Sequence, residues 1–345
     1  MEKIRVLVVD DSSFVRKMVT EMLSTEPEIA VIDTGVDGRE ALEKTLNLKP
    51  DVVILDVIMP MPDGLWALQE IMKQCPTPVI LFSMLTEMES EVSIEAFKLG
   101  AIDVLPKPTS PSALTLAKRK LIEKIKVAAQ VDREKLANLY QSQVREPFYI
   151  IPPVFSTRRL VTIGASAGGP AALLNLMPKF PKELSAGILI AQHMPAFFIK
   201  PFAAHLSRVG PIPVKVAEEG DFITVKRGLL SPGDSTIRIE KLKKGGVVAL
   251  DSTESEHHVL PSIDIMMESA AKVYGPHTVG VLLSGMGKDG VKGLQAIKEV
   301  GGKTIVQDEA SSIVFGMGKE AIQAGVADKV VPLAKIAEEV VKTLE

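Results

Sequence analysis

The segment G-A-S-A-G at residues 164–168 places a serine in a glycine-rich turn between an expected strand and an expected helix. A turn of this G-x-S-x-G form presents the hydroxyl of Ser166 at the edge of a sheet. A serine becomes a nucleophile when an imidazole accepts its proton, and a carboxylate orients that imidazole. His193 follows the next expected strand, and Asp289 lies in a glycine-rich loop after a later strand. These three residues predict a serine hydrolase site.

The same turn offers hydrogen-bond donors for the negatively charged oxygen that forms when a serine attacks an acyl carbon. The backbone N–H of Ala167 and the start of the next helix face the space beside Ser166. The loop L-S-G-M-G-K-D-G, residues 283–290, can bring the backbone N–H of Met286 to the same place. We therefore expect Ala167 and Met286 to form an oxyanion hole.

Other interpretations of these segments are open. A glycine-rich loop before a helix is also typical of nucleotide phosphate sites, although neither G-x-G-x-x-G nor G-K-[ST] is present here. Asp264 is a second candidate to orient His193, but its position resembles that of a helix-start residue. The adjacent pair His257-His258 is an alternative metal-binding segment, although adjacent histidines rarely share one ion.

A second set of polar residues lies at the ends of expected strands near the amino terminus. Its members are Asp10, Asp11, Asp56, Ser83 and Lys107. The carboxyl ends of parallel strands meet at one edge of a sheet, so these side chains are expected to converge. Clustered carboxylates favour a hard divalent cation, and Mg²⁺ at the three aspartates would let Asp56 accept a phosphoryl group. Ser83 and Lys107 would then contact the phosphate, whereas a set of solvated turn residues is the alternative.

Short apolar strands alternate with helix-period segments through most of the chain. In the first part we expect strands at residues 4–9, 30–34, 51–56, 78–83 and 104–105. In the second part we expect them at residues 160–163, 187–191, 278–284, 304–307 and 329–333, with further short strands between 213 and 250. This alternation is typical of parallel sheets covered by helices on both faces. The predicted fold class is α/β with two doubly wound domains.

Charged residues and then prolines interrupt the alternation between the two parts. We expect a first domain at residues 1–130, a linker at 131–157 and a second domain at 158–345. Within this linker, the pattern of residues 132–140 is compatible with an extension of the preceding helix. Each domain would then carry one of the two sets of polar residues.

The composition narrows the class of function. The chain has 345 residues and a formal net charge of −3, which creates no strong field for nucleic acid or an anionic membrane. Its one cysteine, Cys75, excludes an intrachain disulfide and a cysteine-based metal site. No apolar run approaches the roughly 18 residues that a membrane span requires. We expect a cytoplasmic protein with no membrane insertion and no nucleic-acid partner.

Three segments of the first domain form a specific set: V-L-V-V-D-D-S, D-V-V-I-L-D-V-I-M-P-M-P-D-G and A-I-D-V-L-P-K-P. Together they resemble the receiver domain of two-component response regulators, which has a flavodoxin-like fold. The resemblance implies Asp56 as the phosphoacceptor, Mg²⁺ at the three aspartates, Ser83 as a switch hydroxyl and Lys107 as a phosphate partner. Many receivers have an aromatic switch residue where this chain has Val104, so the switch is expected to depend more on Ser83 and loop movement.

Four segments of the second domain form another set: G-A-S-A-G-G-P, A-Q-H-M-P, P-S-I-D and L-L-S-G-M-G-K-D-G. They resemble the Rossmann-like catalytic domain of the chemotaxis protein-glutamate methylesterase (CheB) family. The chain order Ser, His, Asp differs from the Ser, Asp, His order of α/β-hydrolases. The resemblance implies a triad of Ser166, His193 and Asp289 with Met286 at the oxyanion hole. Relatives often have threonine at position 167. This chain has Ala167, which lacks a side-chain hydroxyl and can supply only its backbone N–H.

The resemblance implies a phosphorylation-regulated esterase that removes glutamate methyl esters from methyl-accepting chemoreceptors and also deamidates receptor glutamine. It implies a chemotaxis histidine kinase as phosphodonor and an unphosphorylated receiver domain that covers the catalytic face. Ester hydrolysis would need no cofactor. Two alternatives differ in class: a second domain that only binds a partner or nucleotide, and a hydrolase of small-molecule esters.

Overall fold

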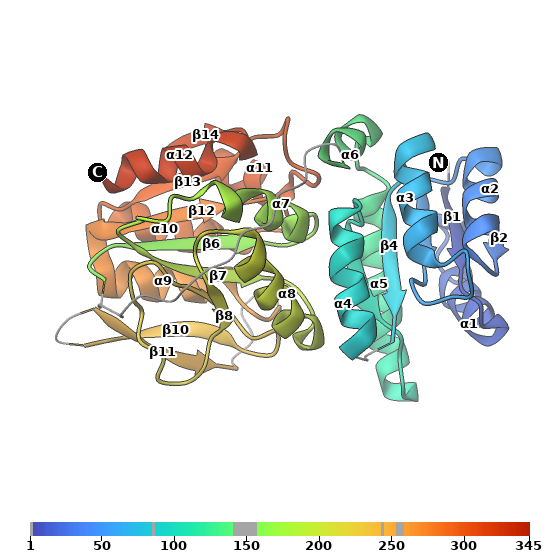
Figure 1. Cartoon of the computed structure of the whole chain (residues 1–345), viewed down its shortest axis with the longest axis horizontal. Helices are drawn as coiled ribbons and strands as arrows, with labels where there is room; N and C mark the ends of the chain where they lie inside the picture. Colours follow the sequence, from blue (N-terminus) through green and yellow to red (C-terminus); the bar gives the residue numbers. More distant parts are fainter. Residues whose placement is uncertain (1–2, 85–86, 141–156, 243–244, 253–258) are drawn as a thin grey trace. The chain divides into compact units, whose positions relative to one another are not determined.

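The computed structural model describes residues 3–84, 87–140, 157–242, 245–252 and 259–345. The chain divides into two compact units, Met1–Gln143 and Val144–Glu345. Each unit has its own parallel sheet (Figure 1) and its own buried core. The predicted pair of α/β parallel-sheet domains is confirmed, whereas the predicted boundaries at residues 130 and 157 stay predictions.

The first unit is built on a five-stranded parallel sheet in the order β2-β1-β3-β4-β5. Its strands are β1 (Ile4–Val9), β2 (Ile29–Gly35), β3 (Val52–Leu55), β4 (Val79–Ser83) and β5 (Asp103–Pro106). Every residue of β3 and β4 is buried, which explains their continuous apolar sequence. Since the strands run in parallel, the residues that follow them meet at one edge.

The helices that the structure describes in the first unit are α1 (Ser13–Ser24), α2 (Gly38–Leu48), α3 (Gly64–Gln74), α4 (Glu87–Lys98), α5 (Pro111–Ala128) and α6 (Arg133–Tyr140). Four of them begin at a side-chain oxygen that accepts a backbone N–H, supplied by Ser12, Asp37, Asp63 and Ser110. Two of these caps, at Ser12 and Asp63, belong to loops that follow β1 and β3. The same loops carry the predicted acidic residues.

Helix α6 is separate from α5, so the expectation that residues 132–140 extend the preceding helix is wrong. Turn hydrogen bonds from Gln130 and Val131 end α5, and the carboxylate of Asp132 then accepts the N–H of Glu134 at 2.9 Å. This capping bond starts a new helix. Helix α6 packs against α3 and buries Leu136. The first third of the predicted linker is therefore folded as part of the first unit.

The second unit is built on a seven-stranded parallel sheet in the order β14-β13-β12-β6-β7-β9-β8. Its strands are β6 (Leu160–Ala165), β7 (Gly187–Gln192), β8 (Val214–Val216), β9 (Gly228–Leu230), β12 (Thr278–Leu282), β13 (Lys303–Gln307) and β14 (Lys329–Val331). A separate antiparallel hairpin is formed by β10 (Thr236–Lys241) and β11 (Gly246–Asp251). This hairpin lies in the region where the sequence predicts only short strands.

The helices of the second unit are α7 (Gly169–Leu176), α8 (Ala196–Val209), α9 (Ile263–Tyr274), α10 (Val291–Glu299), α11 (Gly316–Gln323) and α12 (Leu333–Leu344). Short 3₁₀ turns, η1 (Met177–Lys179) and η2 (Gly275–His277), follow α7 and α9. Helices α9 and α10 pack against each other and against the sheet, and α7 packs against α8 and α12. Within the described ranges, no helix combines the length and hydropathy needed to cross a membrane.

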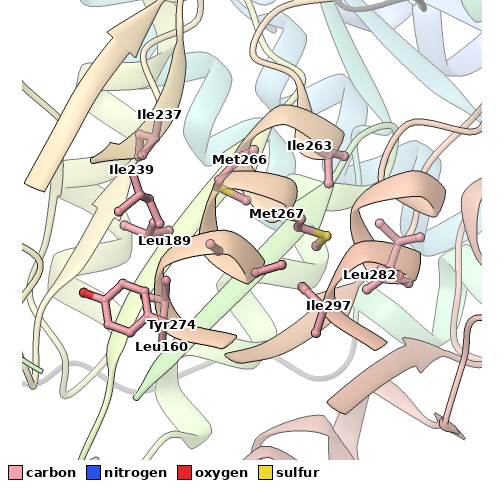
Figure 2. Packing of buried hydrophobic residues seen from close by; sticks show 14 of the residues in the cluster. Leu160, Leu189, Ile237, Ile239, Ile263, Met266, Met267, Tyr274, Leu282 and Ile297 are labelled. Carbon is pink, nitrogen blue, oxygen red and sulfur yellow. The ribbon is translucent and has the colours of Figure 1, made fainter. Parts of the chain in front are cut away.

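Helix α9 contributes many residues to a buried hydrophobic cluster of this unit (Figure 2). Met266 and Met267 are fully buried, with Ile237 and Ile239 of the hairpin on one side and Leu282 of β12 on the other (Figure 2). Burying a side chain of this size contributes about 1.5–3 kcal/mol. This packing fixes the amino end of α9, which lies beside the loops that follow β6 and β12.

Strands β12, β6 and β7 are neighbours in the sheet. Asp289 lies in the loop after β12, Ser166 directly after β6 and His193 directly after β7. Three residues that are far apart in the sequence therefore lie side by side at the carboxyl edge of one sheet.

Candidate functional sites

Ser166 lies in a tight turn between β6 and α7. Its backbone N–H donates to the carbonyl of Ser284 at 3.0 Å, and its own carbonyl accepts the N–H of Gly169 at 2.8 Å. Gly168 has a φ of +73°, and a Cβ there would lie 2.7 Å from both Ile313 Cβ and Ser284 Oγ. Only glycine fits this position, so the turn holds Ser166 between β6 and the loop after β12.

The side chains of Ser166, His193 and Asp289 form one hydrogen-bonded chain. Nδ1 of His193 lies 3.1 Å from Ser166 Oγ, and Nε2 lies 2.8 Å from Asp289 Oδ2. With the Nε2 proton donated to the carboxylate, Nδ1 is free to accept the serine proton. The structure thus brings together the three residues that the sequence predicts, in the geometry that general-base activation of a serine requires.

Asp289 is buried at the amino terminus of α9. Its carboxylate accepts the backbone N–H groups of Ile263 at 2.7 Å and Asp264 at 3.0 Å, and the hydroxyl of Ser262 at 3.3 Å. Burial raises the pKa of Asp289, but the bond and charge of His193 and these backbone donors outweigh it, so the net pKa lies below the ordinary value. The carboxylate is therefore ionised where it meets the imidazole.

Asp264, the second candidate to orient the histidine, accepts hydrogen bonds from other residues than Asp289 does. Its Oδ1 accepts the backbone N–H groups of Gly290 and Gly293, each at 2.8 Å, at the start of α10. Asp289 precedes α10 and caps α9, whereas Asp264 lies in the first turn of α9 and caps α10. The two helices are thus capped reciprocally, and the carboxylate that contacts His193 belongs to Asp289.

The predicted oxyanion residues lie on two sides of the serine. A Cβ on Gly285 would lie 2.8 Å from Ser166 Cβ, so the segment before Met286 passes directly beside the nucleophile. In the described part of the chain, no hydrogen bond uses the backbone N–H of Ala167 or Met286. The hydroxyl of Ser284 donates to the carbonyl of Ala167 at 2.8 Å and links the two segments. The role of the two N–H groups as oxyanion donors stays a prediction.

Two residues of this site carry contacts that the sequence did not predict. Gln192 is buried, and its side-chain amide donates to the backbone carbonyls of both Ser166 and His193. The hydroxyl of Ser284 also accepts the N–H of Val314 at 3.0 Å. A polar residue next to His193 at the end of an apolar strand is the one sequence signal for Gln192, since such strands are otherwise apolar.

His205 and His277, the two other histidines that the structure describes, take no part in this site. His205 is buried in α8, where its Nδ1 lies 2.9 Å from a guanidinium nitrogen of Arg208. His277 lies in η2, next to the start of β12. His257 and His258 fall outside the described residues.

The five predicted residues of the first unit also converge at the carboxyl edge of its sheet. Oxygens of Asp10, Asp11 and Asp56 lie within 4.8 Å of one another. The Lys107 ammonium lies 2.6 Å from Asp56 Oδ2 and 2.8 Å from Asp10 Oδ2. Ser83 is buried at the end of β4, and its carbonyl accepts the N–H of Lys107 at 2.8 Å. The alternative of separate solvated turn residues does not fit the burial of Asp10 and Asp56.

The charge balance of this pocket suits a divalent cation. Burial raises the pKa of Asp56 from 3.8 to about 6, although the charge of Lys107 opposes the shift. Burial also disfavours the charged form of Lys107, but the charges of Asp56 and Asp10 outweigh it and raise the pKa of Lys107. Among the described residues, Lys107 offsets one of the three clustered carboxylates, so the cluster keeps an excess of negative charge. Three carboxylates with hard oxygen atoms fit Mg²⁺.

A receiver-type unit and a unit with a serine–histidine–aspartate relay together define a response regulator whose output is an enzyme. The family model for the response regulator receiver domain matches residues 6–119. The family model for CheB methylesterase matches residues 161–340. The chain belongs to the CheB methylesterase family.

Relatives of full length support this assignment. A protein-glutamate methylesterase/protein-glutamine glutaminase of Pyrococcus abyssi is 46% identical over 99% of this chain and 94% of its own length. A relative of the same name from Thermotoga maritima is 38% identical over 98% of both chains. The crystal structure of the Thermotoga maritima CheB methylesterase catalytic domain has 36% identity and a TM-score of 0.52, and covers 53% of this chain and 97% of that chain.

Proposed function

We propose that this chain hydrolyses glutamate methyl esters on methyl-accepting chemoreceptors and that phosphorylation of its receiver domain regulates the reaction. The observation that carries the proposal is the hydrogen-bonded chain of Ser166, His193 and Asp289 in a family whose members are named methylesterases. An exclusive nucleotide or partner site would not require this relay. The proposal keeps the predicted division into a receiver domain at residues 1–130, a linker at 131–157 that includes helix α6, and a catalytic domain at 158–345.

In the acylation step, Nδ1 of His193 takes the proton of Ser166 while Oγ forms a bond to the ester carbonyl carbon. The tetrahedral oxyanion accepts hydrogen bonds from the backbone N–H groups of Ala167 and Met286. When the intermediate collapses, the C–O bond to the methoxy group breaks, and the imidazolium returns its proton to that oxygen. Methanol leaves, and the glutamyl group stays on Ser166 as an ester.

In the deacylation step, His193 removes a proton from water, and the resulting hydroxide attacks the acyl carbon. The bond to Ser166 Oγ breaks as the imidazolium protonates it, and the product is a glutamate carboxylate. The net reaction consumes one ester and one water and needs no cofactor. A glutamine side chain passes through the same acyl-enzyme with ammonia as the leaving group, as the second part of the relatives' name suggests.

In the receiver domain, Asp56 accepts a phosphoryl group from a chemotaxis histidine kinase. Asp10, Asp11 and Asp56 would hold Mg²⁺, which supplies positive charge beside the transferred phosphoryl oxygens. Lys107 pairs with the phosphate, and the Ser83 hydroxyl donates to it as the switch residue. In the proposed regulation, the unphosphorylated receiver restricts access to the catalytic domain, and phosphorylation relieves that restriction.

The proposed partners are a chemoreceptor as substrate and a kinase as phosphodonor, and the proposed location is the cytoplasm. These assignments rest on the family and on the receiver domain. A nucleic-acid partner and membrane insertion are not part of the proposal.

The test measures methanol release from methylated chemoreceptor by the wild type, Ser166→Ala and Asp56→Asn, each with and without a small phosphodonor and Mg²⁺. We expect the wild type to release methanol faster with phosphodonor, Ser166→Ala to release none, and Asp56→Asn to keep a basal rate that phosphodonor does not change. Asp56→Asn is the matched control because it alters only the receiver.

Equal rates for the wild type and Ser166→Ala would remove Ser166 as the nucleophile. If the wild type cleaves simple esters but leaves methylated receptor intact, the chain is a small-molecule esterase instead.

A further inference from the structure

The backbone pairing of β6 and β7 stops just before the catalytic residues. The register pairs Ala165 with Gln192, and the last backbone bond joins the N–H of His193 to the carbonyl of Ala165 at 3.0 Å. Beyond this point the two chains diverge, one into α7 and the other into α8. The backbone bonds of the sheet therefore end at the N–H groups of Ser166 and His193, and in the described part of the chain none of these sheet bonds uses the carbonyl group of either residue.

The side chain of Gln192 provides hydrogen bonds to the carbonyl groups of both residues. Its Nε2 donates to the carbonyl of Ser166 at 3.0 Å and to the carbonyl of His193 at 3.1 Å. One amide group is thus bonded to the backbone of both the nucleophile and the base. Gln192 is 1% exposed, so water does not compete for these bonds.

Packing alone gives no reason for a glutamine at this position. Its Oε1 is buried and makes no hydrogen bond in the described part of the chain. This atom lies so close to Gly169 that a Cβ there would be 2.3 Å away. An unpaired buried acceptor destabilises the folded state, and an apolar side chain of equal size would avoid it. The two hydrogen bonds that the amide donates and the unpaired Oε1 have opposite effects on stability, so stability alone does not explain the glutamine.

We propose that Gln192 is a positioning residue that holds Ser166 and His193 in register for proton transfer. Gln192 contacts neither the reacting oxygen nor a substrate. By holding the backbone carbonyls of Ser166 and His193, it maintains the 3.1 Å distance between His193 Nδ1 and Ser166 Oγ. The inference rests on the proposed role of Ser166 as a nucleophile but not on the identity of the ester.

The test compares the full-length wild type with Gln192→Met, Gln192→Glu and Thr278→Val. Methionine keeps the volume and removes both the donor and the unpaired acceptor. Glutamate keeps the shape, but its carboxylate cannot donate. Thr278→Val is the matched control: Thr278 is 1% exposed and its hydroxyl donates to Ala270 at 3.4 Å, but it lies at the start of β12, at the opposite edge of the sheet.

Three quantities are measured for each protein: kcat and KM for methanol release, the rate at which phenylmethylsulfonyl fluoride modifies Ser166, and the melting temperature. For both Gln192 variants we expect kcat and the modification rate to fall about tenfold to a hundredfold, because a small misplacement of reacting groups has this effect. We expect KM to stay within about twofold, because the substrate contacts are unchanged. Thr278→Val should keep both rates.

The modification rate separates failure of this inference from failure of the proposed function. If the wild type releases no methanol but Ser166 is still modified, and more slowly in Gln192→Met, the substrate is wrong and the positioning role stands. Unchanged modification in Gln192→Met overturns the positioning role. If the modification rate falls only in proportion to the melting temperature, Gln192 has a structural role, and the positioning role is also overturned.

Discussion

At the scale of single residues, the two sites shift the pKa values of the buried carboxylates Asp289 and Asp56 in opposite directions. Asp289 receives two backbone N–H groups, a hydroxyl and an imidazole, and its pKa falls. Asp56 has Lys107 and a single backbone N–H, from Ile58 at 3.1 Å, and its pKa rises to about 6. The surroundings of Asp289 thus stabilise its ionised form, whereas the ionised form of Asp56 would be stabilised by a further positive charge such as a cation.

Replacing Asp289 by asparagine should lower kcat about 10⁴-fold, because the imidazole loses the anion that orients it. It should also lower the free energy of unfolding by about 1–2 kcal/mol at pH 7. Since the folded pKa lies below the unfolded value, this stabilisation is present above the unfolded pKa and is lost as pH falls through the folded pKa. Urea unfolding should therefore give a constant difference from pH 8 to pH 5 and a smaller one below about pH 4. A difference that already shrinks near pH 6 would contradict this account.

Replacing Asp56 by asparagine should stabilise the receiver unit in EDTA at neutral pH. The folded pKa of about 6 exceeds the unfolded value of 3.8, so stability falls as pH rises between these values and remains lower above them. That difference corresponds to at most about 3 kcal/mol. Thermal unfolding in EDTA should show a higher melting temperature for Asp56→Asn at pH 7.5 and little difference at pH 4.

Millimolar Mg²⁺ should then stabilise the wild type more than Asp56→Asn, because the variant lacks one of the three carboxylates. An equal shift of both melting temperatures with Mg²⁺ would place the cation elsewhere.

Sequence patterns predicted which polar residues converge in space, and the reason is geometric. Ser166, His193, Asp56 and Lys107 directly follow apolar strands, and a parallel sheet brings such positions together whatever the loop lengths. The role of Gln192 was not predictable in the same way. It depends on which strand lies beside β7 and on where their ladder ends, and neither is encoded near residue 192.

At the scale of elements, α9 and α10 stabilise each other through exchanged caps. Asp264 of α9 accepts two N–H groups of the first turn of α10, and Asp289, just before α10, accepts two N–H groups of the first turn of α9. Buried methionines of α9 pack against both the hairpin and the sheet (Figure 2). The carboxylate that contacts His193 is therefore held by the packing of a helix pair.

Replacing Asp264 by alanine should loosen the first turn of α10, because the N–H groups of Gly290 and Gly293 lose their acceptor. We expect a loss of about 1–2 kcal/mol in stability, with faster amide hydrogen exchange in that turn. We also expect a lower kcat, because Asp289 is next to Gly290. Asp264→Asn, which keeps an acceptor oxygen, is the control and should exchange more slowly than the alanine variant. Unchanged exchange at Gly290 in Asp264→Ala would contradict the capping role.

The separate helix α6 shows where element prediction from sequence is limited. The polar and apolar pattern of residues 132–140 suits a helix in either case, so it cannot distinguish one long helix from two. The outcome depends on the Asp132 cap and on the burial of Leu136 against α3. The second of these is a tertiary contact, which local patterns do not contain.

At the scale of the whole molecule, the two units have separate sheets and separate cores. All three members of the serine relay and both proposed oxyanion donors belong to the second unit. A fragment of residues 157–345 should therefore fold and react with phenylmethylsulfonyl fluoride at Ser166 at least as fast as the full chain. Its methanol release should no longer respond to phosphodonor. A fragment that folds but does not react would show that the first unit contributes to the chemistry.

Because β12, β6 and β7 are neighbours in the sheet, the order of the relay residues along the chain differs from their order across the sheet. Along the chain the relay reads Ser, His, Asp, but across the sheet it reads Asp, Ser, His. A circular permutant with new termini in the η2 turn before β12 would change the first order to Asp, Ser, His and leave the second as it is. The order in which a chain reaches its catalytic residues thus records how its strands are connected, and the reaction depends only on their arrangement in space.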